Sequence, residues 1–241
     1  MNILSAVGLV KKYKQATIVN GVNISVRDNE VVGLLGANGA GKTTSFNMII
    51  GLVRQTSGQV LLGDEDISHL PMYQRARMGI GYLPQEHSVF RKLTTEQNIL
   101  SVLEVTGRYT REERHHIADG LMNEFGIFRL KDKQTIMLSG GEQRRVEIAR
   151  ALALSPAFVL LDEPFAGVDP IAVRDIQHII GVLKERGIGV LITDHNVRET
   201  LGICDRAYIL HQGEVLVSGS PYDIMSDERA KEVYLGRDFQ L

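Results

Sequence analysis

The chain has 241 residues, which leaves room for one large domain or two modest ones and excludes an array of many domains. Its 27 Lys and Arg residues against 29 Asp and Glu give a formal net charge of −2, which excludes an overall basic field for nucleic acid or anionic lipid. With 44% hydrophobic and 23% charged residues, the composition is that of a globular protein with a sizeable core.

Cysteine content and hydropathy indicate where such a chain works. Cys204 is the single cysteine, which excludes an internal disulfide, and we expect it to be a small buried apolar side chain. No apolar run approaches the roughly 18 to 20 residues needed to cross a bilayer. Lys11 and Lys12 follow the mildly apolar start, whereas a secretory signal has its basic residues first. We therefore expect a cytoplasmic chain that does not span a membrane by itself.

The first half of the chain predicts one β-loop-α unit followed by a helical segment. Residues 30–35 form an apolar run typical of a buried strand, and a Gly-rich turn separates them from a predicted helix over 42–50. From about 94 to 154 the pattern is helical and charged, with apolar residues at three- and four-residue intervals in 111–125 and 142–154. We interpret this middle segment as a helical insertion.

Strand signals return in the second half. Apolar runs at 158–161 and 189–193 flank a helix predicted from 169 to 187, and such alternation is typical of a parallel α/β core. Residues 207–217 predict a hairpin around Gln212 and Gly213. A partly charged tail, 221–241, completes the chain.

The segment GANGAGKT, residues 36–43, fits the phosphate-loop pattern G-x-x-x-x-G-K-[ST] and has the required strand before it and helix after it. Its glycines allow backbone N–H groups to converge on phosphate oxygens, Lys42 would reach the β- and γ-phosphates, and Thr43 would ligate Mg²⁺. We expect the nucleotide-binding residues here to be Gly36, Asn38, Gly39, Ala40, Gly41, Lys42, Thr43 and Thr44.

Two further strand ends carry candidate catalytic groups. Asp162 and Glu163 follow an apolar run, where Asp162 can hold the Mg²⁺ shell while Glu163 orients and deprotonates an attacking water. In isolation, two acidic residues after an apolar run are typical of a solvated turn. Because this chain also contains a phosphate loop, we favour a role in hydrolysis. His195 follows the strand at 189–193 and could donate to a γ-phosphate or hold the water, or else be a surface or capping residue.

The segment LSGGE, residues 138–142, opens a predicted helix. Ser139 and Glu142 have the spacing of a capping box, which explains them without any ligand. Capping does not require Gly140 and Gly141. Paired glycines cost helix stability but expose N–H donors at a positive helix end, which suits an anion arriving from outside the chain.

With these motifs in this order, and with Gln85 in YLPQ and Asp169 between them, the sequence resembles the ATP-binding-cassette (ABC) ATPases over about residues 9–219. The resemblance implies an α/β fold with a P-loop NTPase (RecA-like) core, an antiparallel β subdomain and an inserted α-helical signature subdomain. It implies a single ABC ATPase domain over 1–241, in which about 1–85 and 156–220 form the core with the β subdomain, about 86–155 the helical subdomain, and 221–241 the tail.

The resemblance also implies roles for particular residues. Tyr13 would stack on adenine, Asp169 would be the D-loop aspartate, and Gln85 would link the nucleotide site to a transmembrane partner while joining Thr43 and Asp162 around Mg²⁺, partly through water. Alternatives remain open: Tyr13 as an ordinary strand aromatic, Gln85 as a loop polar residue, Asp169 as an N-cap alone. The signature residues Ser139, Gly140, Gly141 and Glu142 would contact ATP held by the other subunit.

The family architecture implies a head-to-tail dimer that sandwiches two ATP molecules, with Glu163 and His195 as the catalytic residues. Two transmembrane permease subunits would dock in a groove near Gln85, Phe90 and Arg91, or these last two are plain surface. We expect ATP and Mg²⁺ as cofactors, no nucleic acid, and a peripheral position on the cytoplasmic face of a bacterial inner membrane.

Within the family, the segments at 79–86, 163–170 and 193–200 and the ending at 234–239 are similar to the ATPase subunits of lipopolysaccharide exporters. ATPases of branched-chain amino-acid importers are the alternative, and a soluble non-transport ABC protein is a more distant one. Two departures from the family pattern, Glu142 where Gln is usual and Ala37 where Pro is commoner, remove no phosphate-binding group.

Overall fold

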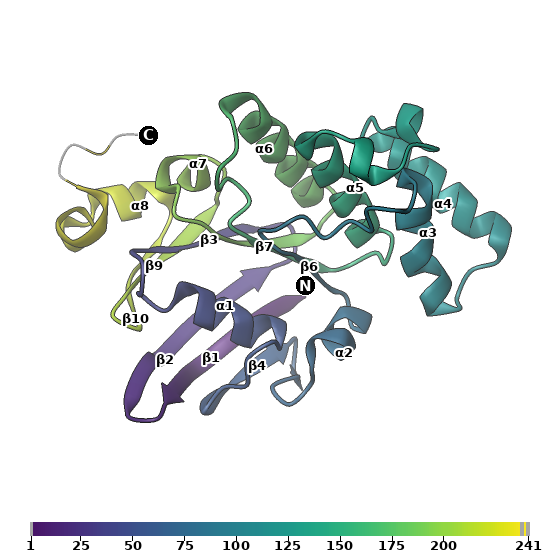
Figure 1. Ribbon diagram of the computed structural model, residues 1–241. Coiled ribbons are helices and arrows are strands. Elements are labelled where there is room, and N and C mark those ends of the chain that lie inside the picture. The colour runs from purple at the N-terminus through teal and green to yellow at the C-terminus, as the bar shows by residue number, and fades with distance from the viewer. Residues whose placement is uncertain (1, 237–238, 240–241) are drawn as a thin grey trace. The chain divides into compact units, whose positions relative to one another are not determined.

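A computed structural model describes residues 2–236 and 239. The chain divides into two compact units, one formed by Met1–Tyr82 with Ala157–Leu241 and the other by Leu83–Pro156. Figure 1 shows that the first unit holds the sheets and the second is built of helices. We call them the sheet unit and the helical unit and describe each by itself.

The sheet unit begins with a four-stranded antiparallel sheet in the order β2-β1-β4-β5. Its long strands, β1 (Ile3–Tyr13) and β2 (Ala16–Arg27), bury alternate side chains over part of their length, as expected of strands with one face on a core. Register shifts interrupt the β1–β2 pairing between Ala6 and Lys12. The short strands are β4 (Ser57–Leu62) and β5 (Glu65–Asp66).

A six-stranded sheet in the order β10-β9-β3-β8-β7-β6 forms the centre of the unit. Strands β3 (Val31–Gly36) and β8 (Gly189–Thr193) are buried at every residue, as strands covered on both faces are. Parallel pairing joins β3 to β8 and β9, and β8 to β7. The carboxyl ends of these strands therefore meet at one edge. The remaining strands are β6 (Ile80–Leu83), β7 (Phe158–Asp162), β9 (Arg206–His211) and β10 (Glu214–Gly219).

Helices cover both faces of this sheet (Figure 1). The helix α1 (Lys42–Ile50) buries Phe46 and Met48 in a core shared by the two sheets. On the other face, α7 (Val197–Leu201) and α8 (Pro221–Ser226) pack Leu201 and Ile224 against β3 and β9. The unit also contains α2 (Met72–Arg77), α6 (Pro170–Glu185), α9 (Glu228–Ala230) and a π-helical turn, Lys231–Leu235.

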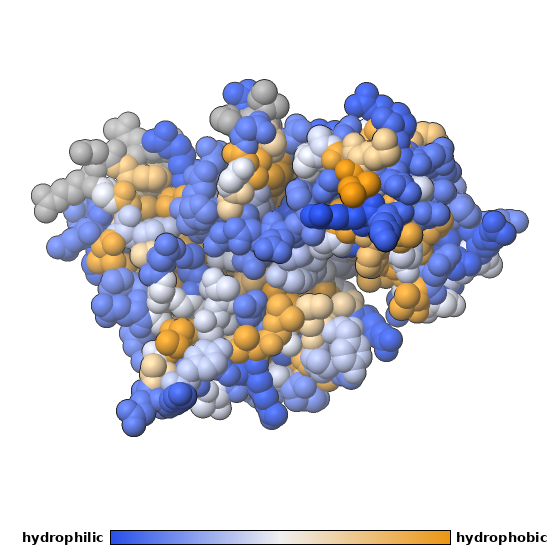
Figure 2. Space-filling model, viewed as in Figure 1, coloured by the Kyte–Doolittle hydropathy of each residue, from blue (hydrophilic) through white to orange (hydrophobic). Residues whose placement is uncertain are grey.

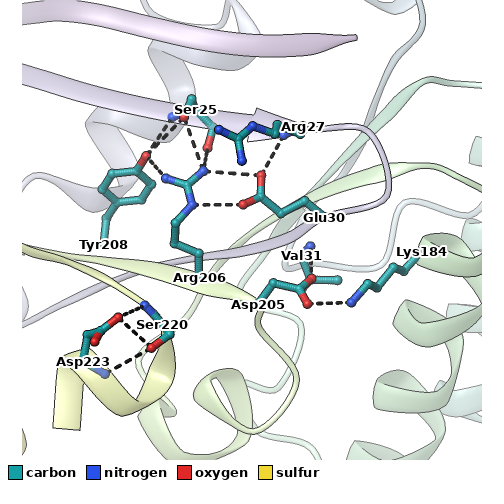
Figure 3. A network of polar contacts seen from close by, with 10 residues as sticks. All are labelled: Ser25, Arg27, Glu30, Val31, Lys184, Asp205, Arg206, Tyr208, Ser220 and Asp223. Carbon is teal, nitrogen blue, oxygen red and sulfur yellow. Dashed lines mark hydrogen bonds and ion pairs between the residues drawn. The ribbon is translucent and has the colours of Figure 1, made fainter. Parts of the chain in front are cut away.

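Polar contacts around Arg206 join the two sheets (Figure 3). Its guanidinium donates to the carbonyl oxygen of Ser25 in β2 at 2.8 Å and to Oε1 of Glu30 at 2.9 Å, and it also contacts the hydroxyl of Tyr208. Glu30 in turn accepts the backbone N–H of Arg27 at 2.8 Å. The charged, bidentate guanidinium of Arg206 in β9 thus holds the antiparallel sheet beside the six-stranded sheet.

The helical unit contains α3 (Thr95–Thr106), α4 (Arg111–Glu124) and α5 (Gly140–Leu152), with short 3-10 turns at Phe128–Leu130 and Thr135–Met137. Each of the three helices starts in a capping box, with N-caps Thr94, Thr110 and Ser139.

None of the helices in the described part of the chain has the length and apolar character to span a membrane.

The elements expected from the sequence are confirmed. The strand at 30–35, the helix at 42–50, the strands at 158–161 and 189–193, and the terminal hairpin match β3, α1, β7, β8 and β9–β10. Cys204 is buried, and burial raises the pKa of its thiol. The expected ending at 234–239 falls partly outside the described residues.

Candidate nucleotide site

The phosphate loop connects β3 to α1, and its shape depends on glycine. Gly36, Gly39 and Gly41 have φ values of 146°, 79° and 100°, which side chains disfavour. A Cβ on Gly36 would lie 2.3 Å from the carbonyl oxygen of Leu210, and one on Gly41 would lie 2.9 Å from that of Ile18. At both positions a side chain would clash with neighbouring backbone atoms, so the loop requires glycine there.

Lys42 lies inside this loop. Its Nζ donates to the carbonyl oxygens of Gly36 at 2.6 Å and Ala37 at 3.1 Å. Burial lowers the pKa of Lys42, and the negative charges of Glu163 and Asp194 oppose that shift. The ammonium group is thus held at the carboxyl edge of the sheet, facing the acidic residues that follow the next strands.

Asp162 is the last residue of β7 and pairs with Thr193 of β8. Burial raises the pKa of Asp162, and the charge of Glu163 raises it further, so a nearby cation would stabilise the ionised form. Thr43 is exposed in the first turn of α1. A carboxylate and a hydroxyl oxygen are ligands that Mg²⁺ accepts, so the residues present fit the ion.

Glu163 has an unusual backbone conformation for a residue with a side chain. Its φ is 44°, in the left-handed region, and its N–H donates to the carbonyl oxygen of Thr193 at 2.7 Å. Its Oε2 lies 3.5 Å from Nδ1 of His195, whose side chain is 57% exposed. The structure thus brings together the two residues that the sequence assigned to catalysis.

Asp194 is the site residue that sequence reasoning missed. Its side chain is fully buried, with Oδ2 accepting the N–H of Phe165 at 2.9 Å and Oδ1 that of Asn196 at 2.7 Å. Burial raises the pKa of Asp194, while these backbone bonds lower it. In the sequence, Asp194 lies between a buried strand and His195. That pattern predicts where Asp194 lies but does not indicate what it does.

Tyr13 ends β1 with 49% of its surface exposed. The Nζ of Lys11 lies 4.8 Å from the centre of its ring, a cation–π contact. The ring is therefore an accessible stacking surface on the antiparallel sheet.

Gln85 and the signature residues belong to the helical unit. Gln85 is exposed in the loop after β6. Ser139 caps α5 and completes the capping box with Glu142, as expected. Gly140 and Gly141 are exposed and have no positive φ, and a Cβ on Gly141 would meet nothing within 4 Å. Neither backbone conformation nor close packing within the described chain explains glycine at position 141.

The sequence profile of the ABC transporter family matches residues 19–166. The chain belongs to the ABC transporter family. Curated relatives named "Lipopolysaccharide export system ATP-binding protein LptB" are similar along its whole length. The protein of that name from Haemophilus influenzae is 56% identical over 241 residues, covering 100% of both chains. That from Escherichia coli K12 is 54% identical over 241 residues, again covering 100% of both.

Solved structures of ABC cassettes share the fold. An ATP-binding cassette of an ABC transporter in its ADP conformation is 28% identical with a TM-score of 0.86, covering 98% of this chain and 100% of that one. A dimeric cassette in a post-hydrolysis state, bound to ADP and Pi, is 27% identical with a TM-score of 0.78, covering 90% and 98%. The expected fold class and family are confirmed, and the chain is an ATP-hydrolysing enzyme.

In this ABC ATPase, Asp169 acts as a helix cap. Its Oδ1 accepts the N–H of Ala172 at 3.1 Å at the start of α6. The structure thus contains the capping contact, while capping as the whole role of Asp169 and its D-loop role both stay predictions.

Proposed function

We propose that this chain is the ATP-hydrolysing subunit of a lipopolysaccharide exporter in a bacterial inner membrane. The observation that carries the proposal is the end-to-end similarity to LptB proteins at 54–56% identity. The similarity includes the tail region beyond the matched family profile, which ends at residue 166. The ATPase of a branched-chain amino-acid importer is the alternative that an experiment must exclude.

The sheet unit serves as the nucleotide-binding core. The phosphate loop and Lys42 would hold the phosphates, Tyr13 would stack on adenine, and Thr43 and Asp162 would hold Mg²⁺, partly through water. When bound, Mg²⁺ neutralises charge on the phosphates. Support comes from the exposed ring of Tyr13 and from the convergence of Lys42 and the carboxylates at one sheet edge.

Hydrolysis uses the residues after β7 and β8. Glu163 orients the attacking water and accepts its proton as the water attacks the γ-phosphorus in line, while the bond from that phosphorus to the β–γ bridging oxygen breaks and ADP leaves. His195 and Lys42 donate hydrogen bonds to the γ-phosphoryl oxygens as negative charge moves onto them. The 3.5 Å separation of Glu163 Oε2 and His195 Nδ1 supports this division of roles, since a water held by Glu163 would lie next to the phosphoryl oxygen that His195 contacts.

A complete site requires two copies of the chain. The exposed N-terminus of α5, with Ser139 as its cap and Gly140 and Gly141 in its first turn, offers N–H groups to the γ-phosphate of ATP on a second copy. Glu142 supports this turn through the capping box. We assign Gly141 to this contact because nothing within the described chain requires glycine there.

The helical unit carries the surface for the membrane subunits. Figure 2 shows apolar side chains among charged ones on the visible face of this unit. Phe90 is 52% exposed, and its backbone N–H and carbonyl both bond the buried amide of Asn98, at 2.8 and 3.2 Å. The Cζ of Arg150 lies 5.2 Å from the Phe90 ring centre. An exposed aromatic held this firmly is a pre-organised contact for two permease subunits, together with Gln85 and Arg91.

The test is a pull-down of the tagged chain from solubilised inner membranes, with the bound subunits identified by mass spectrometry. We expect lipopolysaccharide-exporter subunits with the wild type and with Phe128→Asp, a control at another exposed aromatic of the helical unit. Phe90→Asp should lose them. Recovery of amino-acid permease subunits would overturn the cargo, and recovery of no membrane protein would favour a soluble ABC protein.

A further inference from the structure

The buried carboxylate of Asp194 connects two loops that carry the catalytic residues. It lies directly before His195, and its two oxygens accept N–H groups from two different segments. Oδ1 bonds Asn196 within its own loop, and Oδ2 bonds Phe165 in the loop after β7, 29 residues away in sequence. Both donors are backbone groups, so the bonds fix the course of the chain and not only a side chain.

The second loop is the one that contains Glu163. Phe165 follows Glu163 by two residues and is buried, with 3% of its surface exposed. Glu163 itself bonds the carbonyl oxygen of Thr193, the residue before Asp194. The loop after β7 is therefore attached at two points, on either side of Pro164, to Thr193 at the end of β8 and to Asp194 directly after it. These attachments set the 3.5 Å distance between Glu163 and His195.

The charges that surround Asp194 belong to the same site. Burial lowers the pKa of Lys42, and the negative charge of Asp194 opposes that shift. Nδ1 of His195 lies 3.7 Å from Oδ1 of Asp194. Asp162 and Tyr234 also experience its charge. A buried carboxylate is costly unless its oxygens are well hydrogen-bonded, and here backbone N–H groups of both loops bond to it.

We propose that Asp194 is a positioning residue for ATP hydrolysis, which holds the Glu163 loop in register with His195 without touching the nucleotide. The role requires two acceptor oxygens facing two N–H donors. An asparagine offers one acceptor and one NH₂ group, so one of the buried N–H groups would face a donor. This inference rests on the roles proposed above for Glu163 and His195.

The test compares steady-state ATPase rates, nucleotide affinity and thermal unfolding of Asp194→Asn and Asp194→Ser with Asp205→Asn. Asp205 is a matched control, because its carboxylate also accepts a backbone N–H, that of Val31 at 2.9 Å, and pairs with Lys184. We expect both Asp194 variants to lose about 10- to 100-fold in kcat while KM for ATP stays within about twofold. Asp205→Asn should lower Tm and leave kcat within about twofold.

Two results would overturn the proposal. One is a kcat within twofold of wild type in Asp194→Asn. The other is a loss of ATP affinity or of the folded state in both Asp194 variants, which would assign Asp194 to the fold or to binding. Measuring Glu163→Gln in the same assay distinguishes failure of the role proposed for Glu163 from failure of the role proposed for Asp194. If it remains active, the proposed role of Glu163 fails; if it is inactive while Asp194→Asn is active, only the role of Asp194 fails.

Discussion

The backbone N–H of Glu163 donates to the carbonyl oxygen of Thr193 at 2.7 Å, so the ends of β7 and β8 are joined at the point where the sheet stops. Glu163 adopts a left-handed conformation with φ of 44°. For a residue with a Cβ this conformation costs roughly 1–2 kcal/mol and persists only where neighbouring contacts enforce it. The bond to Thr193 is such a contact, and it directs the Glu163 carboxylate toward His195.

Replacing the Glu163 carboxylate by an amide tests its role as the base. Glu163→Gln keeps the side-chain shape and the backbone bond to Thr193 but cannot accept a proton from water. We expect kcat to fall by about 10²- to 10⁴-fold, the range ascribed to general-base catalysis. ATP binding should persist, and the variant should accumulate as an ATP-bound dimer. Phosphate release and size-exclusion chromatography with ATP measure the two effects.

Glu185→Gln is a suitable control for this experiment, because Glu185 is an exposed carboxylate at the end of α6. It should hydrolyse ATP at the wild-type rate and form no trapped dimer. Phosphate release by Glu163→Gln at the wild-type rate would contradict the assignment of the base.

Sequence patterns were sufficient where the chemistry is local. The phosphate loop, the pairs at 162–163 and 194–195, and the capping box of Ser139 and Glu142 are each contained within a few residues, and the structure contains them as expected. The catalytic, nucleotide and partner roles given to these residues stay predictions.

What the sequence did not reveal depends on contacts between distant segments. The sequence does not predict β1 and β2 individually, because their pairing is interrupted by register shifts that obscure a simple alternation. The role proposed for Asp194 depends on the hydrogen bond that it accepts from the backbone N–H of Phe165, 29 residues away in sequence. The buried side chain of Arg75 likewise bonds the distant carbonyls of Met48 and Ile49, and that of Glu147 accepts the distant N–H of Ser88.

Arg75 is a buried guanidinium that completes the C-terminal end of α1. Only 1% of its surface is exposed, and it donates to the carbonyl oxygens of Met48, Ile49, Leu70 and Ser68. Burial lowers the pKa of Arg75 to about 10. The last carbonyls of a helix have no partner within it, so this side chain replaces the missing donors.

We expect Arg75→Met to destabilise the fold by about 2–5 kcal/mol, because each buried carbonyl left without a donor costs about 1–3 kcal/mol. Urea unfolding followed by circular dichroism measures the loss. Arg77→Met is the control, since Arg77 is exposed and rests 5.8 Å from the Tyr73 ring centre. Equal stability of the two variants would show that the carbonyls find other donors.

Glu147 links α5 to the segment after β6 within the helical unit. Its fully buried carboxylate lies 3.1 Å from Arg144 Nη1 and 3.4 Å from His87 Nδ1, and it accepts the N–H of Ser88. Arg144 donates at 2.9 Å to the carbonyl oxygen of Pro84, next to Gln85. One buried ion pair thus fixes the loop that carries Gln85 to the signature helix.

Removing one member of this pair leaves a buried charge without its partner. Glu147→Ala should therefore cost about 3–5 kcal/mol and expose residues 84–90 to limited proteolysis. Glu104→Ala breaks an exposed pair with Arg114, at 3.6 Å, and should change stability little. Protection of residues 84–90 in Glu147→Ala equal to that in the wild type would contradict this link.

Acid should weaken the start of α4 through Glu113. Its carboxylate accepts the N–H of Thr110 at 2.7 Å, and hydrogen bonds from Thr110 lower the pKa of Glu113 from its ordinary 4.5. Because the native pKa lies below the unfolded one, the unfolded chain binds more protons as the pH falls. The contribution of this cap is complete above pH 4.5 and is lost as the pH falls through the lowered pKa.

Glu113→Gln isolates that contribution. The amide oxygen of Gln accepts the Thr110 N–H at any pH, so the Thr110 amide resonance should titrate in acid in the wild type and not in the variant. Glu112→Gln changes the neighbouring carboxylate, which is not the capping residue, and should titrate like the wild type. An unchanged titration of Thr110 in Glu113→Gln would assign the acid response to another group.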